Sequence, residues 1–196
     1  MTNMYYEKNP TADHDIHELH VRLLDTPMVF LTDAGVFSKK MVDYGSQALL
    51  NTLNLESGKT LLDVGCGYGP LGLTLGKVFG VQATLIDINS RAVDLAKTNA
   101  EKNWVDAKVF QSNIYEDVEG KFDYIISNPP IRAGKVVVHE IIKGAFHHLE
   151  DRGSLTIVIQ KKQGAPSAKS KMEEVFGNCQ ILKKDKGYYI LESVKE

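Results

Sequence analysis

Thr60-Leu-Leu-Asp-Val-Gly-Cys-Gly-Tyr-Gly69 is the stretch that decides the fold of this chain. Its first half, 60–64, has the length and the apolar, β-branched content of a buried strand. The glycines at 65, 67 and 69 allow a sharp turn and a close approach of the backbone to a ligand, because glycine has no Cβ. A helix predicted from Pro70 to Gly80 would point its N-terminal N–H groups at that ligand. The stretch therefore predicts a cofactor-binding loop.

The whole chain has the composition of an ordinary globular protein. It has 196 residues, of which 43% are hydrophobic and 24% charged, and its formal net charge is −2. This length suits one α/β domain with a small extension, and the charge alone gives no argument for nucleic-acid binding. No apolar targeting segment or transmembrane run occurs, and neither the two cysteines nor the scattered histidines suggest a metal site. We therefore expect a cytoplasmic protein that binds no membrane and no metal.

Strand and helix patterns alternate along the chain. Apolar and polar residues alternate from His17, and an apolar run follows at 28–32 after a turn at 25–27, which predicts a β-hairpin. We therefore divide the chain into an extension, 1–34, and a main domain, 35–196. The main domain has predicted strands at 60–64, 81–87, 107–111, 122–126, 154–159, 179–182 and 188–191. It has predicted helices at 39–53, 70–80, 90–104 and 134–150, with Trp104 in the apolar stripe of the third. A further helix is predicted after a loop at 161–171. This order predicts an α/β fold: a seven-stranded, mostly parallel, doubly wound, Rossmann-like sheet with an antiparallel C-terminal strand pair.

Two acids narrow the choice of cofactor. Gly67-x-Gly69-x-x-Gly72 also matches the dinucleotide fingerprint, with Asp87 near the ribose position, but such a pattern is common by chance. Asp63 lies near the end of an otherwise apolar strand, where burial of a carboxylate is costly unless hydrogen-bond donors meet it. A cofactor with an ammonium group would help to explain this acid, whereas a dinucleotide pyrophosphate would not.

The loop resembles the first motif of class I S-adenosylmethionine-dependent methyltransferases, and the resemblance extends over roughly residues 35–195. It implies that S-adenosylmethionine is the cofactor, that the second strand ends in the acid that binds the ribose, and that the polar pair Ser112-Asn113 lies near the adenine, where the family usually has an aspartate. The cofactor-binding residues expected on this basis are Asp63, Gly65, Cys66, Gly67, Gly69, Asp87, Ile88, Asn113, Ile114, Asn128 and the upstream aromatic Phe37. Cys66 is interpreted as a small residue beside the ligand, because a nucleophile would need a histidine partner nearby.

Ser127-Asn-Pro-Pro130 follows the fourth predicted strand of the main domain, at the carboxyl edge where ligands bind in open α/β sheets. Pro129 and Pro130 lack N–H groups, which leaves their carbonyls as acceptors, and the Asn128 side chain adds another acceptor oxygen. A cluster of acceptors suits a planar amino group and would turn its nitrogen lone pair toward a methyl donor. Such a reaction requires neither a metal nor a strong base. We therefore assign the catalytic role to these three residues.

This sequence resembles the Asn-Pro-Pro-aromatic signature of amino-group methyltransferases, whose substrates include adenine N6, guanine N2 and protein glutamine amides. The fourth position is Ile131, so the usual stacking platform is absent there. Phe37 could supply an aromatic ring instead, or the amino group could be held differently. The longer strings Asn128–Lys135 and Gly35-Val-Phe-Ser38 are similar to the catalytic half of small-subunit ribosomal RNA guanine-N2 methyltransferases, and to their stand-alone small relatives.

The resemblance implies methylation of guanine N2 in ribosomal RNA, either naked or in a ribosomal particle, by a monomer or a homodimer. Arg132 and Lys135, with lysines 161, 162, 169 and 171, could meet RNA phosphates, although a solvated lysine-rich loop explains the second group equally well. The alternatives are a protein-glutamine, adenine-N6 or small-molecule methyltransferase, and, from another class, a non-catalytic RNA-binding module with the same fold.

Overall fold

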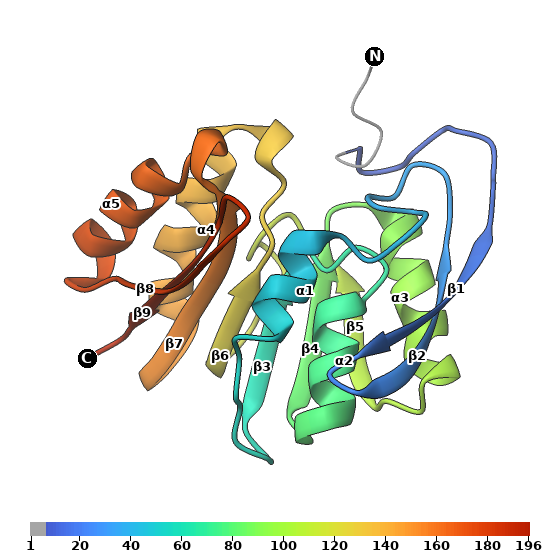
Figure 1. Ribbon diagram of the computed structural model, residues 1–196, viewed down its shortest axis with the longest axis horizontal. Helices are drawn as coiled ribbons and strands as arrows, with labels where there is room; N and C mark the ends of the chain where they lie inside the picture. The colour runs from blue at the N-terminus through green and yellow to red at the C-terminus, as the bar shows by residue number, and fades with distance from the viewer. Residues whose placement is uncertain (1–6) are drawn as a thin grey trace.

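Seven strands form one sheet in the computed structural model, which describes residues 7–196 apart from the side chain of Ile131. The strands are β3 (Thr60–Val64), β4 (Gln82–Asp87), β5 (Ala107–Gln111), β6 (Phe122–Ser127), β7 (Leu149–Gln160), β8 (Gln180–Asp185) and β9 (Tyr188–Val194). Their order is β5-β4-β3-β6-β7-β9-β8 (Figure 1). The first five are parallel, and β9 runs antiparallel to both β7 and β8. The predicted sheet, with its antiparallel C-terminal pair, is confirmed.

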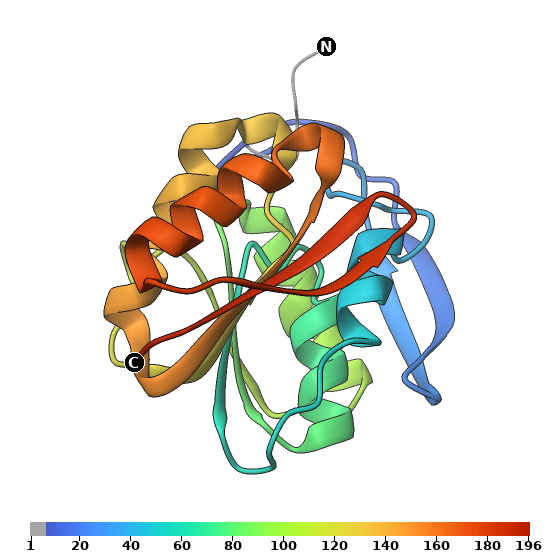
Figure 2. The same cartoon turned by 60° about the vertical axis from the view of Figure 1, so that its left-hand side comes forward.

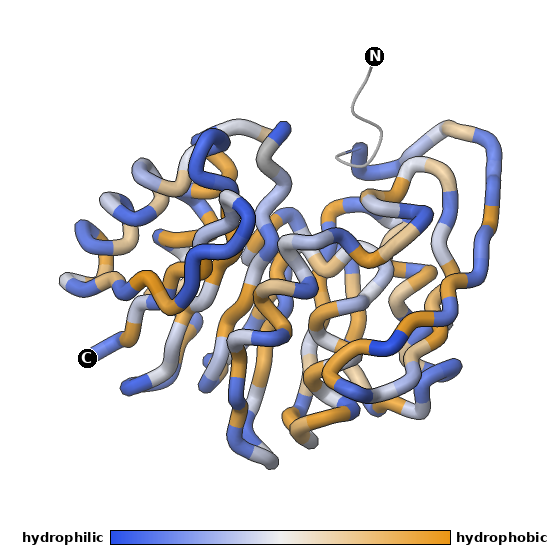
Figure 3. Tube along the Cα trace, viewed as in Figure 1, coloured by the Kyte–Doolittle hydropathy of each residue, from blue (hydrophilic) through white to orange (hydrophobic). Residues whose placement is uncertain are grey.

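Helices cover both faces of this sheet. They are α1 (Tyr44–Leu50), α2 (Pro70–Phe79), α3 (Ser90–Lys102), α4 (Lys135–His148) and α5 (Ala165–Phe176), with short 3-10 turns η2 (Ile131–Ala133) and η3 (Lys161–Gln163). One apolar core packs α1, α2 and α3 on one face, and a second packs α4 and α5 on the other (Figures 1 and 2). The central strands are largely apolar, and polar residues gather at the turns (Figure 3). No helix within residues 7–196 is long and apolar enough to cross a membrane.

Two predicted helix starts are wrong, and both errors come from residues that set the first turn. The helix predicted from residue 39 begins at Tyr44, because the carboxylate of Asp43 accepts a hydrogen bond from the Ser46 N–H (3.2 Å) and caps it. The predicted loop at 161–171 already contains the first turns of α5, which begins after Gly164 and has Pro166 in its first turn. Turn residues outweighed the apolar pattern at both places.

The C-terminal ends of two other helices also differ from the prediction. Trp104 does not continue the buried stripe of α3, since the helix ends at Lys102 and the Trp104 side chain is 92% exposed with a φ of 56°. The helix predicted at 134–150 ends at His148, and the chain then enters β7 directly at Leu149. The strand predicted at 154–159 is therefore only the second half of β7.

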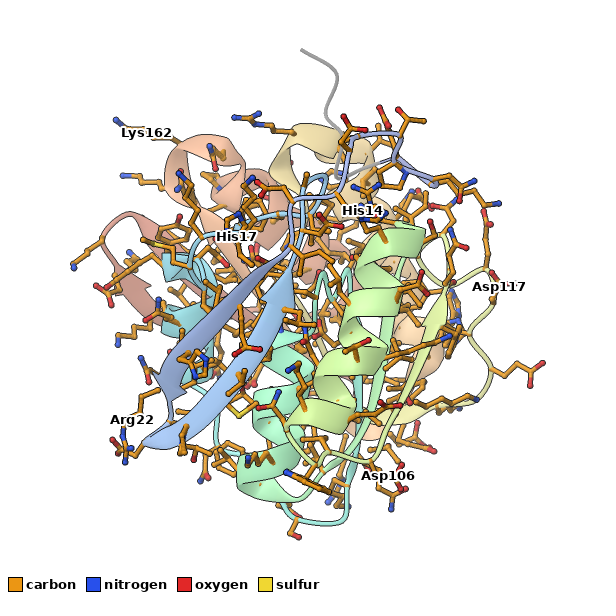
Figure 4. The ribbon with its side chains drawn as sticks, turned by 90° about the vertical axis from the view of Figure 1, so that its right-hand side faces the viewer. His14, His17, Arg22, Asp106, Asp117 and Lys162 are labelled. Carbon is orange, nitrogen blue, oxygen red and sulfur yellow. The ribbon has the colours of Figure 1, made fainter. Side chains whose placement is uncertain are left out.

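The N-terminal hairpin consists of β1 (His17–Leu23) and β2 (Thr26–Thr32), as predicted, but with a tighter turn that leaves Pro27 inside β2. It lies beside α3, with Arg22 at its tip (Figure 4). Two asparagines of α3 attach it: Asn99 binds the N–H and the C=O of Leu31 (2.7 and 3.0 Å), and Asn103 binds those of Val29 (3.0 and 2.7 Å). The hairpin is thereby fixed to the main sheet through a helix.

The histidines of this region each contact a single acid. His14 lies against Asp33, while His17 and His20 lie against acids of their own segment (3.1 and 2.7 Å). Across residues 7–196, no group of three or more histidine, cysteine or acidic side chains is arranged to hold a metal ion.

Candidate active site

A cavity of about 520 Å³ opens at the carboxyl ends of β3, β4 and β6. This volume lies within the roughly 300–1,000 Å³ typical of small-molecule sites. The expected site residues that line it are Phe37, Gly65, Cys66, Gly67, Asp87, Ile88, Asn113, Ile114, Asn128, Pro129 and Pro130. The structure thus brings the glycine loop and the segments expected at the ribose and the adenine to one cavity, together with the Asn-Pro-Pro segment.

The glycine loop after β3 is held against β4. The backbone N–H groups of Gly65 and Cys66 both donate to the carbonyl of Ile86 (2.9 Å each). Gly65 and Gly67 have φ values of 75° and 57°, and a Cβ at either would meet no heavy atom within 4 Å. Their positive φ angles, rather than close packing, therefore explain why glycine occupies these positions.

Gly69 does not line the cavity. It is the N-cap residue of α2, with a φ of 103°, and a Cβ there would approach Leu73 Cδ1 to 2.7 Å. Its observed contribution is to let the chain turn tightly into α2, and its expected contact with the cofactor remains a prediction.

Asp63 does not line the cavity either. It is fully buried beneath the loop, where Oδ2 accepts a hydrogen bond from the N–H of Gly72 (2.9 Å), and within residues 7–196 its Oδ1 has no partner. Burial, reinforced by the charge of Asp87, raises the pKa of Asp63 to about 7, although the Gly72 hydrogen bond opposes this rise. Asp63 therefore ties β3 to α2, and the cofactor ammonium that was expected to meet it remains a prediction.

Asp87 ends β4 and faces the cavity. Its Oδ2 accepts from the Gly67 N–H (2.8 Å) and its Oδ1 from the Asn89 N–H (2.9 Å). Burial raises the pKa of Asp87 to about 6, while these backbone hydrogen bonds act in the opposite direction. The Ile88 N–H acts on the carboxylate in the same way, and the acceptor capacity that remains on the cavity side can receive a ribose hydroxyl group while Asp87 holds the loop.

The residues after β5 form the far wall of the cavity. Ile114 contributes an apolar side chain, and the N–H of Ser112 donates to the carbonyl of Asp87 (3.0 Å). Asn113 also lines the cavity, but its amide nitrogen donates to Glu116 Oε1 (2.8 Å). The wall suits a flat, largely apolar ring such as adenine, with Asn113 at its rim.

Phe37 lies on the loop between β2 and α1 and is 48% exposed where it borders the cavity. This loop is attached to the start of α3, because the amide of Asn89 donates to the carbonyl of Gly35 (2.8 Å). The Arg91 guanidinium holds the same loop and the segment before β1, donating to the carbonyls of Ala34 and Ala12 (2.7 Å each). The backbone segment that carries Phe37 is thus held beside the cavity.

The Asn-Pro-Pro segment leaves β6 beside the glycine loop. Ser127 Oγ donates to the carbonyl of Val64 (2.7 Å), which joins the ends of β6 and β3. Asn128 Nδ2 donates to Asp43 Oδ2 and to Ser46 Oγ (3.0 Å each), so Oδ1 is the amide atom left to accept from a ligand. The Pro130 carbonyl already accepts one hydrogen bond, from the Ala133 N–H (2.9 Å), so only its second lone pair is left for a ligand.

Sequence reasoning missed several lining residues of this cavity, and three of them, Asp43, Ser46 and Tyr188, matter most for the site. Asp43 could have been found as a helix cap, since Asp before an apolar periodic run is a common helix start. Tyr188, at the start of β9, had no such signal. Its ring packs so closely on α1 that a Cβ at Gly45 would lie 2.8 Å from Tyr188 Cε1.

Comparison with known proteins agrees with this geometry. Residues 27–192 match the family model of the methyltransferase small domain. The uncharacterized protein YbxB of Bacillus subtilis (strain 168) is 45% identical over 202 residues, covering 100% of both chains. The ribosomal RNA small subunit methyltransferase C of Erwinia tasmaniensis is 37% identical over 166 residues, which cover 82% of this chain and 48% of the relative.

Among solved structures, the T. thermophilus 16S rRNA guanine-N2 methyltransferase RsmC, in complex with AdoMet and guanosine, has a TM-score of 0.86 and 26% identity. The match covers 95% of this chain and 52% of that one. The chain thus spans about half the length of these two methyltransferases.

Fold and site together define a class I methyltransferase that uses S-adenosylmethionine. The segments that end β4 and β5, where the ribose and the adenine are expected, and the Asn-Pro-Pro segment at the end of β6 line one cavity. The chain belongs to the methyltransferase small-domain family.

Proposed function

We propose that this protein transfers a methyl group from S-adenosylmethionine to the exocyclic N2 amino group of a guanine in small-subunit ribosomal RNA. The observation that carries the proposal is the fixed Asn128 amide, whose nitrogen is bound to Asp43 and Ser46 and whose oxygen is left as an acceptor in the cavity that Asp87 also lines. Support for guanine comes from the RsmC structure, which is a complex with AdoMet and guanosine. A ribosomal substrate places this activity in the cytoplasm.

In this proposal Gly65, Cys66 and Gly67 surround the methionine end of the cofactor, with Asp63 buried beneath them, while Asp87 and Ile88 lie at the ribose, and Asn113 and Ile114 at the adenine. S-adenosylmethionine supplies a methyl group made electrophilic by its sulfonium sulfur. Asn128 Oδ1 accepts one hydrogen of the substrate amino group and so turns the nitrogen lone pair toward that methyl group. A new N–C bond forms as the S–C bond breaks, and the nitrogen then releases a proton to solvent. The carbonyl dipole of Asn128 stabilises the positive charge that develops on the nitrogen.

Two aromatic side chains can hold a planar base in this cavity. Phe37 and Tyr188 line it, on the loop before α1 and at the start of β9. They offer an answer to the missing aromatic at position 131, whose side chain lies outside the described residues. We assign the stacking role to Tyr188, because its ring packs against Gly45, between the two residues that hold Asn128.

Positive charge near the cavity supports an RNA substrate. Arg132 and Lys135 are exposed beside the Asn-Pro-Pro segment, and Lys161 and Lys162 are exposed in η3, where Lys162 projects outward (Figure 4). The lysines at 169 and 171 contribute less, since they lie in α5 and pair with Glu173 and Glu174. We assign the proposed phosphate contacts to Arg132, Lys135, Lys161 and Lys162 because these side chains are exposed near the cavity.

Nucleoside mass spectrometry of ribosomal RNA from cells with and without the protein tests the substrate. We expect N2-methylguanosine at one site to disappear without the protein and to return with the parent gene but not with Asn128→Ala. Purified protein, S-adenosylmethionine and either naked RNA or small subunits from the deficient cells then identify the substrate form. An unchanged nucleoside profile, or a lost modification other than N2-methylguanosine, would contradict the proposal. A lost N6-methyladenosine would instead support the adenine-N6 alternative.

A further inference from the structure

The amide of Asn128 has a defined orientation. Its nitrogen lies 3.0 Å from a carboxylate oxygen of Asp43 and 3.0 Å from the hydroxyl of Ser46. An ionised carboxylate can only accept hydrogen bonds, so the amide atom that faces Asp43 must be the nitrogen, which carries the hydrogens. A flipped amide would place two oxygens against each other. Asp43 therefore determines which end of Asn128 is offered to a ligand.

Asp43 is itself fixed by the helix that it caps. The same Oδ2 that binds Asn128 also accepts from the Ser46 N–H (3.2 Å), and the Gln47 N–H donates to the Asp43 carbonyl (3.1 Å). Ser46 is only 3% exposed, so its hydroxyl has little freedom to turn away. The first turn of α1 thus forms a rigid holder for a side chain 85 residues further along the chain.

We propose that Asp43, assisted by Ser46, is a positioning residue for methyl transfer, which fixes Asn128 so that Oδ1 receives the substrate amino group. This inference rests on the proposed function, in which Asn128 Oδ1 is the acceptor. The hydrogen bonds that the amide nitrogen donates also polarise the amide and make its oxygen a stronger acceptor. A misplacement of about 1 Å in such a group can lower a rate about 100-fold.

Two substitutions separate positioning from helix capping. Serine is as good an N-cap as aspartate, so Asp43→Ser preserves the helix start, but its hydroxyl is one bond too short to reach Asn128. Asparagine has the shape of aspartate, and its amide oxygen can accept from both Asn128 and the Ser46 N–H, so Asp43→Asn retains the orientation without the charge. Gln47→Ala is the matched control, since it removes a hydrogen bond of the same helix turn (Nε2 to the Val42 carbonyl, 2.8 Å).

Steady-state kinetics with S-adenosylmethionine and small ribosomal subunits from deficient cells give the first readout. We expect Asp43→Ser to lower kcat about 100-fold with little change in either KM, Asp43→Asn to stay within about tenfold of the parent, and Gln47→Ala to stay within about twofold. A kcat within about threefold of the parent for Asp43→Ser would overturn the proposal. So would an Asp43→Asn variant as slow as Asp43→Ser, because the isostere keeps both hydrogen bonds.

Side-chain amide NMR gives a second readout that needs no substrate. The Asn128 side-chain signals, assigned by their absence in Asn128→Ala, should exchange slowly with water in the parent and in Asp43→Asn, and at least about tenfold faster in Asp43→Ser. Fast exchange in the parent would refute the fixed orientation. If the parent methylates no ribosomal RNA but its Asn128 signals are protected in this way, then the proposed function has failed while the positioning by Asp43 stands.

Discussion

Replacing Asp63 by asparagine is expected to change how the free energy of unfolding depends on pH. Asp63 is fully buried, and burial raises its pKa from 3.8 to about 7 in the folded protein. Between these two values the folded state binds more protons than the unfolded state. The contribution of Asp63 to stability is therefore present at low pH and is lost as the pH rises through this range.

The magnitude follows from the two pKa values. A rise from 3.8 to about 7 corresponds to about 4 kcal/mol between the acidic and the alkaline limits, of which about 3 kcal/mol develops between pH 5 and pH 8. Asparagine keeps an oxygen for the Gly72 N–H but places an amide group where Oδ1 has no partner among the described residues. That unpartnered group costs about 1–3 kcal/mol at every pH, so the pH dependence is the diagnostic quantity.

Urea unfolding at several pH values between 5 and 8 measures this effect. The stability of Asp63→Asn relative to the parent should rise by about 3 kcal/mol over that range. Asp123→Asn is the control. Burial tends to raise the pKa of Asp123, but hydrogen bonds from Thr60 and the charge of Lys59 hold this pKa below its usual value. The difference in free energy of unfolding between Asp123→Asn and the parent should therefore stay constant between pH 5 and pH 8. A difference for Asp63→Asn that changes by less than about 1 kcal/mol would refute the reasoning.

Three further changes test other parts of the site. The pKa of Asp87 is about 6, and its carboxylate form is the one that accepts hydrogen bonds from the ribose. The affinity for S-adenosylmethionine, measured by calorimetry, should therefore fall about tenfold from pH 7 to pH 5. Equal affinities at the two pH values would contradict this role of Asp87. Tyr188→Ala should weaken guanosine binding about tenfold, as loss of a stacking ring does, whereas Tyr188→Phe should not; unchanged binding by Tyr188→Ala would remove the stacking role. Gly69→Ala should lower the free energy of unfolding by about 1–3 kcal/mol, because the new Cβ would approach Leu73. Gly58 also has a positive φ, but a Cβ there would meet no atom within 4 Å, so Gly58→Ala should lower the free energy of unfolding less. Equal losses in the two variants would show that the Leu73 contact is irrelevant.

Sequence patterns predicted the sheet well because its strands are short apolar runs between clear turn signals. The strand before Gly65 and the helix from Pro70 to Gly80 were placed to within a residue, since glycine and proline determine the backbone there. Trp104 was misplaced because an apolar residue at helical spacing was counted as part of α3, which Asn103 in fact ends. Periodicity alone does not show where a helix ends.

The candidate site was predictable where its residues follow strand ends, and less so where tertiary contacts bring residues in. Asp87 and Asn128 were found because the carboxyl ends of neighbouring parallel strands meet at one edge. Tyr188 comes from a strand whose position beside α1 is fixed only by the order of the whole sheet. Asp63 shows the opposite limit, because the sequence identified a costly buried acid but not the Gly72 N–H that meets it.

The attachment of the hairpin to α3 has a consequence for self-association. Four residues of helix rise about 6 Å and two residues of strand about 6.6 Å, so Asn99 and Asn103 are spaced almost like two residues of a neighbouring strand. Their amides pair with the N–H and C=O groups of Leu31 and Val29, as a third strand would. A helix thus closes an edge of β2 that could otherwise recruit a strand from another molecule, and this route to aggregation is blocked without lengthening the sheet.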